Sequence, residues 1–251
     1  MTQHLYLLTG ASRGMGLAMA EQLLSADHFL VCISRHTNEI LASRAAKLGC
    51  QLEQWQLDLE RSVDAAAKLT QWLASQKTGS FASATLINNA GVMPGVAPLS
   101  ESDPIDLSRA LRVGLEAPLL LTAAFLGATA SWNIPRKVLN ISSGLGRRAM
   151  ASQAGYCAAK AGMDHFTRCL ALDEARKPLG AKVCSLAPGV IDTAMQVQLR
   201  AAEASAFPDK KNFVDLKVND QLTAPDMAAT QVLAYLARPD FGQQPIADVR
   251  D

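Results

Sequence analysis

The sequence predicts a single α/β domain in which helices cover both faces of a parallel sheet. Short apolar runs alternate with longer segments of helical periodicity along nearly the whole chain, which is typical of repeated strand–helix units. The apolar runs are nearly continuous, as in strands that are buried on both faces. The chain has 251 residues, of which 49% are hydrophobic, and no linker divides it. This length and composition suffice for one large core.

The first half of the chain contains four predicted strands, and a predicted helix follows each of the first three. The run LYLLTG predicts the first strand, and Leu17, Ala20 and Leu24 recur behind it at helical spacing. Gly49 ends the second helix, and the alternating pattern after it predicts the third strand. The strands are expected at 5–10, 29–34, 51–59 and 84–91, and the helices at 14–26, 38–49 and 62–76.

The second half continues the alternation. A long apolar segment predicts helical structure in one or two pieces, and Pro188 marks the end of the sixth strand. Right-handed crossovers between such units give a doubly wound, Rossmann-type parallel sheet of about seven strands, with residues 1–251 in one domain. The remaining strands are expected at 137–143, 181–189 and 244–249, and the helices at 104–131, 153–176 and 225–237.

Residues 190–222, called the lid segment below, interrupt this pattern. The segment is polar and alanine-rich, contains Pro208 and has no clean periodicity. An insertion at this point of the fold lies over the carboxyl ends of the strands, so we expect it to act as a substrate lid. A flexible surface loop is the alternative that the sequence leaves open.

Charge and cysteine usage exclude several classes of protein. The formal net charge is +1, which argues against nucleic acid or an acidic membrane as the main partner. Five cysteines without a C-x-x-C pair favour free thiols in a reducing compartment. The N-terminus has no signal-peptide pattern, and no segment is expected to have the 18 or more apolar residues of a membrane helix. We therefore expect a cytoplasmic protein that binds no nucleic acid, membrane or metal.

The first strand runs directly into TGASRGMG, residues 9–16. Glycines at 10, 14 and 16 let the turn tighten and let the backbone approach a diphosphate at the start of a helix, where free N–H groups favour anions. The spacing G-x3-G-x-G differs from G-x-G-x-x-G, and glycines also serve bare turns. The position between an N-terminal strand and a helix favours dinucleotide binding.

The second predicted strand ends in Ser34 and Arg35, without the carboxylate that holds the ribose of NAD. Arg13 of the glycine loop lies on the same side of this topology, and two guanidiniums with a hydroxyl suit a 2′-phosphate. We therefore expect NADP(H), with solvated surface arginines as the alternative. Asp58 is expected to accept from the adenine amine, and Asn89 either lies beside the nucleotide or stabilises a turn.

The segment GYCAAKAG places Tyr156 and Lys160 four residues apart, on one face of a predicted helix. An ammonium beside a phenol is expected to lower the tyrosine pKa from about 10 toward the working pH, as suits a general acid that protonates a carbonyl oxygen. Lys160 can also hold ribose hydroxyls. Ser143, at the carboxyl end of the fifth strand, is expected to bind the same carbonyl oxygen.

The motifs TGASRGMG, NNAG, NISS, YCAAK and PGVIDT occur in this order over almost the whole chain, which resembles the short-chain dehydrogenase/reductase family. The resemblance implies a nicotinamide-dependent enzyme in which Ser143 orients the carbonyl, Tyr156 is the acid/base and Lys160 tunes Tyr156. It also places Pro188, Gly189 and Thr193 by the nicotinamide amide, and it implies homodimers or homotetramers. The segment 112–122 departs from the family pattern, because Gly114 stands where the family has an asparagine thought to hold a water of the proton relay.

The C-terminal third is similar to the sepiapterin reductase and benzil reductase branch, through DTAMQ, FVDL and FGQQPIADVRD. In that branch the tail closes over the pocket and an aspartate near the end anchors a pterin. Asp248 corresponds to it, with an ion pair to Arg250 as the alternative. The apolar lid residues Met195, Leu199, Phe207 and Phe213 would suit an apolar ketone or a vicinal diketone, or else simply pack the lid.

The expected enzyme is thus an NADPH-dependent reductase of a ketone, a vicinal diketone or a pterin side chain. Two alternatives stay open: another substrate class (3-oxoacyl thioester, sugar or steroid alcohol), and a non-catalytic NADP(H)-binding sensor or scaffold. The expected catalytic residues are Ser143, Tyr156 and Lys160, and the expected substrate contacts are Ser143, Tyr156, Met195 and Asp248. The expected cofactor-binding residues are Gly10, Ser12, Arg13, Gly14, Met15, Gly16, Ser34, Arg35, Asp58, Leu59, Asn89, Ala90, Gly91, Tyr156, Lys160, Pro188, Gly189, Val190 and Thr193.

Overall fold

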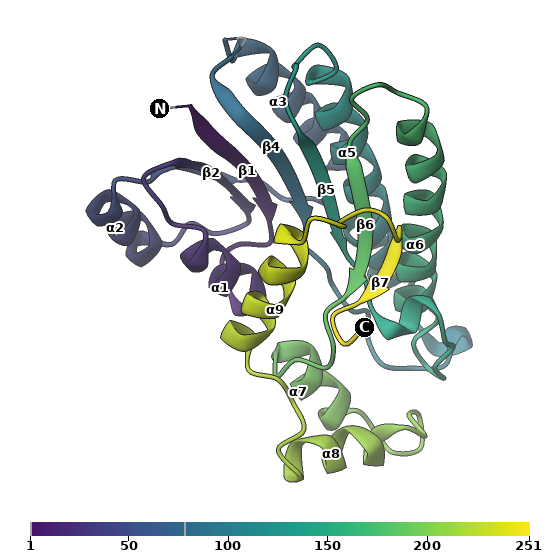
Figure 1. The fold of residues 1–251 in the computed structure, drawn as a ribbon. Helices are drawn as coiled ribbons and strands as arrows, with labels where there is room; N and C mark the ends of the chain where they lie inside the picture. The colour runs from purple at the N-terminus through teal and green to yellow at the C-terminus, as the bar shows by residue number, and fades with distance from the viewer. Residues whose placement is uncertain (1, 78) are drawn as a thin grey trace.

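A seven-stranded sheet forms the centre of the protein (Figure 1), in a computed structural model that describes residues 2–77 and 79–251. The strand order is β3-β2-β1-β4-β5-β6-β7, and each neighbouring pair is parallel. This order confirms the doubly wound sheet that the alternation predicts. The strands are β1 (Gln3–Thr9), β2 (His28–Ser34), β3 (Gln51–Gln56), β4 (Phe81–Asn88), β5 (Arg136–Ile141), β6 (Lys182–Ala187) and β7 (Ile246–Asp248).

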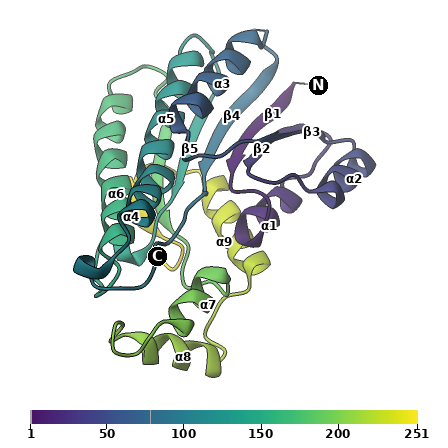
Figure 2. The same cartoon turned by 180° about the vertical axis from the view of Figure 1, so that it is seen from behind.

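Helices cover both faces of the sheet, and Figure 2 shows the second face from behind. On one face lie α1 (Gly14–Gln22), α2 (Glu39–Leu48) and α9 (Pro225–Ala237), and on the other lie α3 (Ser62–Ser75), α4 (Pro104–Leu111), α5 (Ala117–Ala128) and α6 (Ala154–Ala175). Two further helices, α7 (Ala194–Ala201) and α8 (Lys210–Val218), lie beyond the carboxyl ends of the strands. Most predicted elements agree with these bounds to within about three residues.

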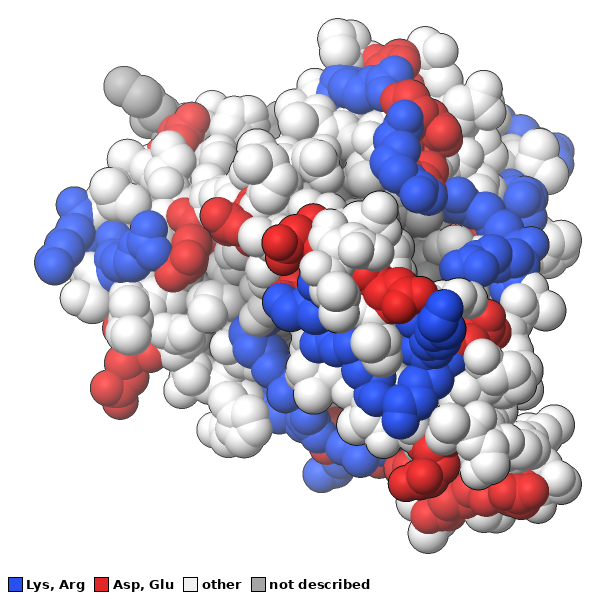
Figure 3. Space-filling model, turned by 90° about the horizontal axis from the view of Figure 1, so that it is seen from below, with Lys and Arg blue, Asp and Glu red and all other residues white. Residues whose placement is uncertain are grey.

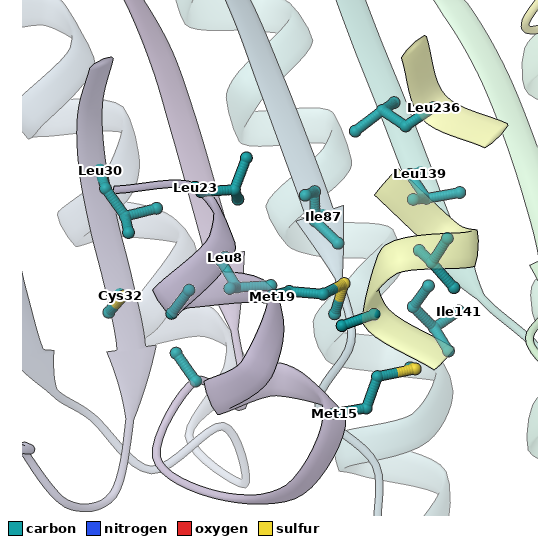
Figure 4. Packing of buried hydrophobic residues seen from close by; sticks show 14 of the residues in the cluster. Leu8, Met15, Met19, Leu23, Leu30, Cys32, Ile87, Leu139, Ile141 and Leu236 are labelled. Carbon is teal, nitrogen blue, oxygen red and sulfur yellow. The ribbon is translucent and has the colours of Figure 1, made fainter. Parts of the chain in front are cut away.

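The core consists of one hydrophobic cluster on each side of the sheet. Figure 4 shows the cluster under α1 and α9, where Leu8 of β1, Met19 of α1 and Ile87 of β4 are fully buried. On the opposite side, Leu7 of β1 and Phe125 of α5 belong to the second cluster. Successive strand residues point to opposite faces, so continuous apolar strands supply both clusters at once.

The lid segment is more ordered than its irregular pattern indicates. It forms α7 and α8, which enclose a third hydrophobic cluster of Leu199, Phe207 and Phe213. The rings of Phe207 and Phe213 stack with centroids 5.6 Å apart. The helices have eight and nine residues, too short for a clear helical period in the sequence. The segment is therefore helical rather than irregular, and its action as a substrate lid stays a prediction.

One helical stretch, Pro104–Ala128, is long and apolar enough to cross a membrane, with a mean hydropathy of 1.4 over an 18-residue window. The expectation that no segment reaches this length is therefore wrong. Half of that window is buried inside the fold, and Leu121 and Phe125 are fully buried in the core. These are the features of a core helix, which passes the same test of length and composition.

Candidate active site

A cleft of about 790 Å³ lies at the carboxyl ends of the strands. Every residue expected to bind cofactor or substrate lines this cleft, from Gly10 to Asp248. The carboxyl ends of parallel strands meet at one edge of the sheet, and the change of chain direction between β1 and β4 opens a crevice there. Figure 3 views the molecule from this end and shows lysines and arginines gathered there, interspersed with carboxylates.

The glycine loop is shaped for close contact with a ligand. Gly10 and Gly14 have φ of +70° and +55°, which favours glycine. A Cβ at Gly16 would lie 2.1 Å from the Gly10 carbonyl oxygen, so helix α1 can start here only with a glycine. No side chain caps the N-terminus of α1, which leaves its first N–H groups free to bind an anion. This loop fits the diphosphate of a dinucleotide.

Asn89, directly after the end of β4, is hydrogen-bonded to the end of β1, where the glycine loop begins. Its amide Nδ2 donates to the Thr9 carbonyl oxygen at 2.9 Å, and the Thr9 hydroxyl accepts from the backbone N–H groups of Asn89 and Ala90, both at 2.9 Å. Asn89 therefore has a structural role between two neighbouring strands rather than within a local turn, and it also lines the cleft, where its contact with the nucleotide stays a prediction. It supports the site by fixing the backbone of β1 beside the glycine loop.

Two arginines flank the glycine end of the cleft. Arg13 and Arg35 are both exposed, and neither has a carboxylate within 4.0 Å among residues 2–77 and 79–251. Both guanidiniums are thus available to an anionic ligand. Asp58 also lines this end and is exposed, and its Oδ1 accepts from the Glu60 N–H at 3.0 Å.

Lys160 is buried, with 3% of its surface exposed, and its Nζ donates to the Ile141 carbonyl oxygen at 2.7 Å. Burial lowers the pKa of Lys160 to about 8, and the charge of Asp164, one turn further along α6, opposes this shift. The ammonium lies 5.8 Å from the centre of the Tyr156 ring. The two side chains therefore stand together on one face of α6, as the spacing predicts.

The pKa of Tyr156 differs from the sequence-based expectation. Tyr156 keeps partial exposure, but enclosure by the cleft walls raises its pKa to about 12, against the opposing effect of a hydrogen bond with Ser143. The expectation that Lys160 lowers this pKa is wrong in direction. The physical reason is that the ammonium is directed to the Ile141 carbonyl rather than to the phenol, so burial of the phenol dominates.

Ser143 reaches Tyr156 from the opposite wall of the cleft. It directly precedes the short helix η3 (Gly144–Gly146), and its Oγ accepts from the Leu145 N–H at 3.2 Å. The Ser143 hydroxyl lies close enough to Tyr156 to oppose the rise in its pKa, and both residues line the cleft. Such a pair can bind one carbonyl oxygen from two directions, which is the geometry that stabilises developing negative charge.

The substrate end of the cleft is mostly apolar. Its walls include Met93, Met150 and Met195 together with Leu199 and Phe213. A Cβ at Gly91 would lie 3.8 Å from both Lys160 Nζ and Met195 Cε. Gly91 therefore lies between Lys160 and the lid segment, at ordinary contact distance from both.

Asp248 lines the same end but is already paired. Its carboxylate forms a bidentate ion pair with Arg250, at 2.7 Å to Nε and 2.6 Å to Nη2. The Arg250 N–H donates to it as well, at 3.1 Å. The ion pair that the sequence left open as an alternative is therefore confirmed, and it lowers the pKa of Asp248.

Gly114 lies in a π-helical turn, η2 (Arg112–Glu116), which joins α4 to α5. Such turns are frequent at functional sites. A Cβ at Gly114 would lie 3.1 Å from the Ala159 Cβ, next to Lys160 in sequence. The position therefore faces the back of the catalytic helix, as the alignment with the family pattern implies.

Comparison with known proteins decides the family. The sequence profile of the short chain dehydrogenases matches residues 4–204. The chain belongs to the short-chain dehydrogenase/reductase family. Members of this family are oxidoreductases that act on CH–OH or C=O groups with NAD(P)(H), and the protein is such an oxidoreductase.

Relatives within the short-chain dehydrogenases cover nearly the whole chain. Benzil reductase ((S)-benzoin forming) of Bacillus cereus is 32% identical over 237 residues, which is 94% of this chain and 95% of the relative. Sepiapterin reductase of Bos taurus is 30% identical over 254 residues, with 94% and 91% covered. A solved structure of a metagenomic short-chain oxidoreductase in complex with NADP has a TM-score of 0.72 at 26% identity, with 98% and 94% covered.

Three features of this short-chain dehydrogenase site could not be predicted from residue types alone. The partner of Lys160 is a main-chain carbonyl, which no sequence pattern marks. Arg148 lines the cleft beside Ser143, yet its type is common on surfaces. Asp164 lies buried behind Lys160; its spacing of four from Lys160 is the only signal that points to it.

Proposed function

We propose that the protein is an NADPH-dependent carbonyl reductase in which Tyr156 is the general acid. The observation that supports this most strongly is that Ser143, Tyr156 and a buried Lys160 line the same cleft as the glycine loop, with the Lys160 ammonium 5.8 Å from the centre of the Tyr156 ring. Perturbed titratable groups that converge in a cleft favour catalysis over binding alone.

The chain's own residues account for the proton and for the orientation of the carbonyl. When bound, the reduced nicotinamide supplies a hydride to the carbonyl carbon. Tyr156 then donates its hydroxyl proton to the carbonyl oxygen, and Ser143 donates a hydrogen bond to the same oxygen as negative charge develops. A phenol with a pKa of about 12 is fully protonated near neutral pH and still more acidic than the alcohol being formed, so the proton transfer runs downhill.

Lys160 has two roles in this proposal. Its ammonium holds the ribose hydroxyls, and its charge attracts the phenolate that remains after Tyr156 has given up its proton, an effect smaller than the burial that raises the Tyr156 pKa. Both roles need the protonated form of Lys160, which its pKa of about 8 permits near neutral pH. Tyr156 regains its proton from solvent before the next turnover.

The proposed cofactor preference is for NADP(H). Arg13 and Arg35 present exposed, unpaired guanidiniums among the described residues at the glycine end of the cleft, and the second strand ends without a carboxylate. A 2′-phosphate dianion gains charge-assisted hydrogen bonds there. The structural relative that binds NADP supports this preference.

The proposed substrates are ketones and vicinal diketones with apolar substituents, for which the methionine-lined end of the cleft is suited. The benzil and sepiapterin reductases among the relatives support a carbonyl compound of this kind. Asp248 is less suited to anchor a pterin, because Arg250 already occupies both carboxylate oxygens. A pterin would have to displace this ion pair.

A panel of carbonyl compounds tests the proposal. We expect NADPH oxidation, followed at 340 nm, to be faster with benzil and related aromatic diketones than with sepiapterin, acetoacetyl thioesters or simple sugars. Faster reduction of acyl thioesters would assign another substrate class. Tight NADPH binding without turnover of any carbonyl would instead indicate a sensor.

A further inference from the structure

An ion pair between the buried Asp164 of α6 and the partly exposed Arg147 joins three segments near the active site. Asp164 lies one helical turn after Lys160 and is 1% exposed. Its Oδ1 accepts from the Ser185 hydroxyl of β6 at 2.6 Å, and its Oδ2 accepts from Arg147 Nε at 3.2 Å. A buried carboxylate is costly unless such partners satisfy it, so its presence here calls for a reason.

Arg147 extends this contact to the C-terminal strand. Its Nη2 donates to the Ala247 carbonyl oxygen at 2.7 Å, one residue before Asp248. One guanidinium therefore bonds both to α6 and to β7. Neither Arg147 nor Asp164 is among the described residues that line the cleft, so both act on the reaction only through other groups.

The loop that carries Ser143 lies directly on α6 at this point. A Cβ at Gly146 would lie 3.0 Å from Asp164 Oδ2 and 3.0 Å from the Lys160 carbonyl oxygen. The backbone of this loop therefore packs tightly against α6 between Lys160 and Asp164. Ser143 stands at the start of this loop and Arg147 at its end.

We propose that Arg147 and Asp164 are positioning residues that clamp the Ser143 loop and β7 onto α6 and so fix the alignment of Ser143 with Tyr156. The inference rests on the proposed function, because the alignment of these two hydroxyls matters only if they share a carbonyl oxygen. The clamp also holds the negative charge of Asp164 near Lys160, where it favours the ammonium. Misplacing a catalytic group by about 1 Å can cost about 10²-fold in rate.

Kinetics of four single variants, one double variant and one control variant test the clamp. Arg147→Met and Asp164→Ala should each lower kcat by about 10- to 100-fold, with the Kd for NADPH within about twofold of wild type, since neither residue lines the cleft.

The conservative variants Arg147→Lys and Asp164→Asn keep part of the contact, so their loss of kcat should be smaller. The double variant Arg147→Met/Asp164→Ala should be no slower than the worse single variant, because both belong to one unit. Arg238→Met is the matched control, since it breaks an exposed ion pair with Asp240 at 2.8 Å.

Two outcomes would overturn the inference: kcat within about twofold of wild type in folded Arg147→Met, or multiplicative losses in the double variant. The Arg147 side chain is 30% exposed, so variants at this position test the clamp even if Asp164→Ala fails to fold.

Amide hydrogen exchange tests the clamp without measuring activity. Exchange at Gly144–Gly146 and Ile246–Asp248 should rise in Arg147→Met and stay unchanged in Arg238→Met. If wild type reduces no carbonyl, the proposed function fails, while the exchange result still decides whether the clamp exists.

Discussion

The protein keeps the charge of Lys160 inside the site at a cost in hydration free energy. A buried ammonium loses hydration, and the single hydrogen bond to the Ile141 carbonyl replaces only part of it. The result is a pKa lowered to about 8, a shift that Asp164 limits through its negative charge. The same burial raises the pKa of Tyr156 to about 12. Desolvation therefore pushes the two groups of the acid/base pair toward their neutral forms.

These directions predict the pH dependence of reduction. A base is mostly protonated below its pKa, so Lys160 should keep its ammonium below about pH 8 and lose it above. Activity should therefore be flat on the acid side and fall as the pH rises through about 8. Tyr156 stays protonated through this range and adds no second loss. The charged group that acts on the Lys160 pKa is Asp164 on its own helix.

The measurement is kcat/KM for NADPH-dependent reduction between about pH 6 and pH 10, with enzyme stability checked at each end. A profile without a fall above about pH 8 would contradict the role of the Lys160 ammonium. In Asp164→Asn the fall should begin at lower pH, because the charge that favours the ammonium is gone.

A substitution of the single residue Arg35 tests the predicted preference for NADP(H). Arg35→Asp replaces a cation with a carboxylate that repels a 2′-phosphate and can hold a ribose hydroxyl. The ratio of kcat/KM for NADPH to that for NADH should fall by at least about tenfold, the factor that about 1.4 kcal/mol represents. Arg35→Gln, which removes charge without reversing it, should fall between Arg35→Asp and wild type. A preference for NADH in the unmodified protein would refute the NADP(H) assignment.

At the scale of elements, the π-helical turn at Arg112–Glu116 is the main departure from regular structure near the site. Gly114 stands in it and faces Ala159. If the family asparagine supports the proton relay at this position, its absence should slow proton exchange rather than abolish catalysis. A water bonded to main-chain carbonyls can fill the same role.

Gly114→Asn tests this reading. It should raise turnover or leave it unchanged, as measured by kcat at saturating NADPH. The new Cβ approaches the Ala159 Cβ to 3.1 Å, so some readjustment of α6 is required. Gly114→Ala is the matched control, because it introduces the same Cβ without the amide. A severe loss in Gly114→Asn, with Gly114→Ala near wild type and both folded, would count against the relay.

Long helices with a regular hydrophobic periodicity could be predicted from the sequence, and short helices without a clear periodicity could not. Helix α6 has 22 residues and agrees with its prediction to within one residue at each end. Helices α7 and α8 remained hidden, since their stability comes from contacts of Phe207 and Phe213 rather than from periodicity. The π-helical turn was not predicted either, because it depends on one extra residue between α4 and α5.

At the scale of the whole molecule, the position of the site followed from topology. Parallel strands bring Gly10, Asn89, Ser143 and Asp248 to one edge of the sheet, although 238 positions separate the first from the last. Sequence reasoning could therefore collect the cleft residues without knowing any distance. It left the pairing of Asp248 with Arg250 open as one of two alternatives, and it could not give the direction of the Lys160 ammonium or the contact of Arg147 with Asp164. Each depends on which partner lies within about 3 Å, which only packing decides.

The central claim is that the Tyr156 hydroxyl delivers the proton to a carbonyl oxygen. It is tested most directly by comparing Tyr156→Phe with wild type under saturating NADPH and an aromatic diketone, with the Kd for NADPH measured in parallel. We expect kcat to fall by about 10²- to 10⁴-fold, the usual contribution of general acid catalysis, with the Kd nearly unchanged because the ring remains. A Tyr156→Phe protein that binds NADPH normally and reduces the diketone at the wild-type rate would contradict the account.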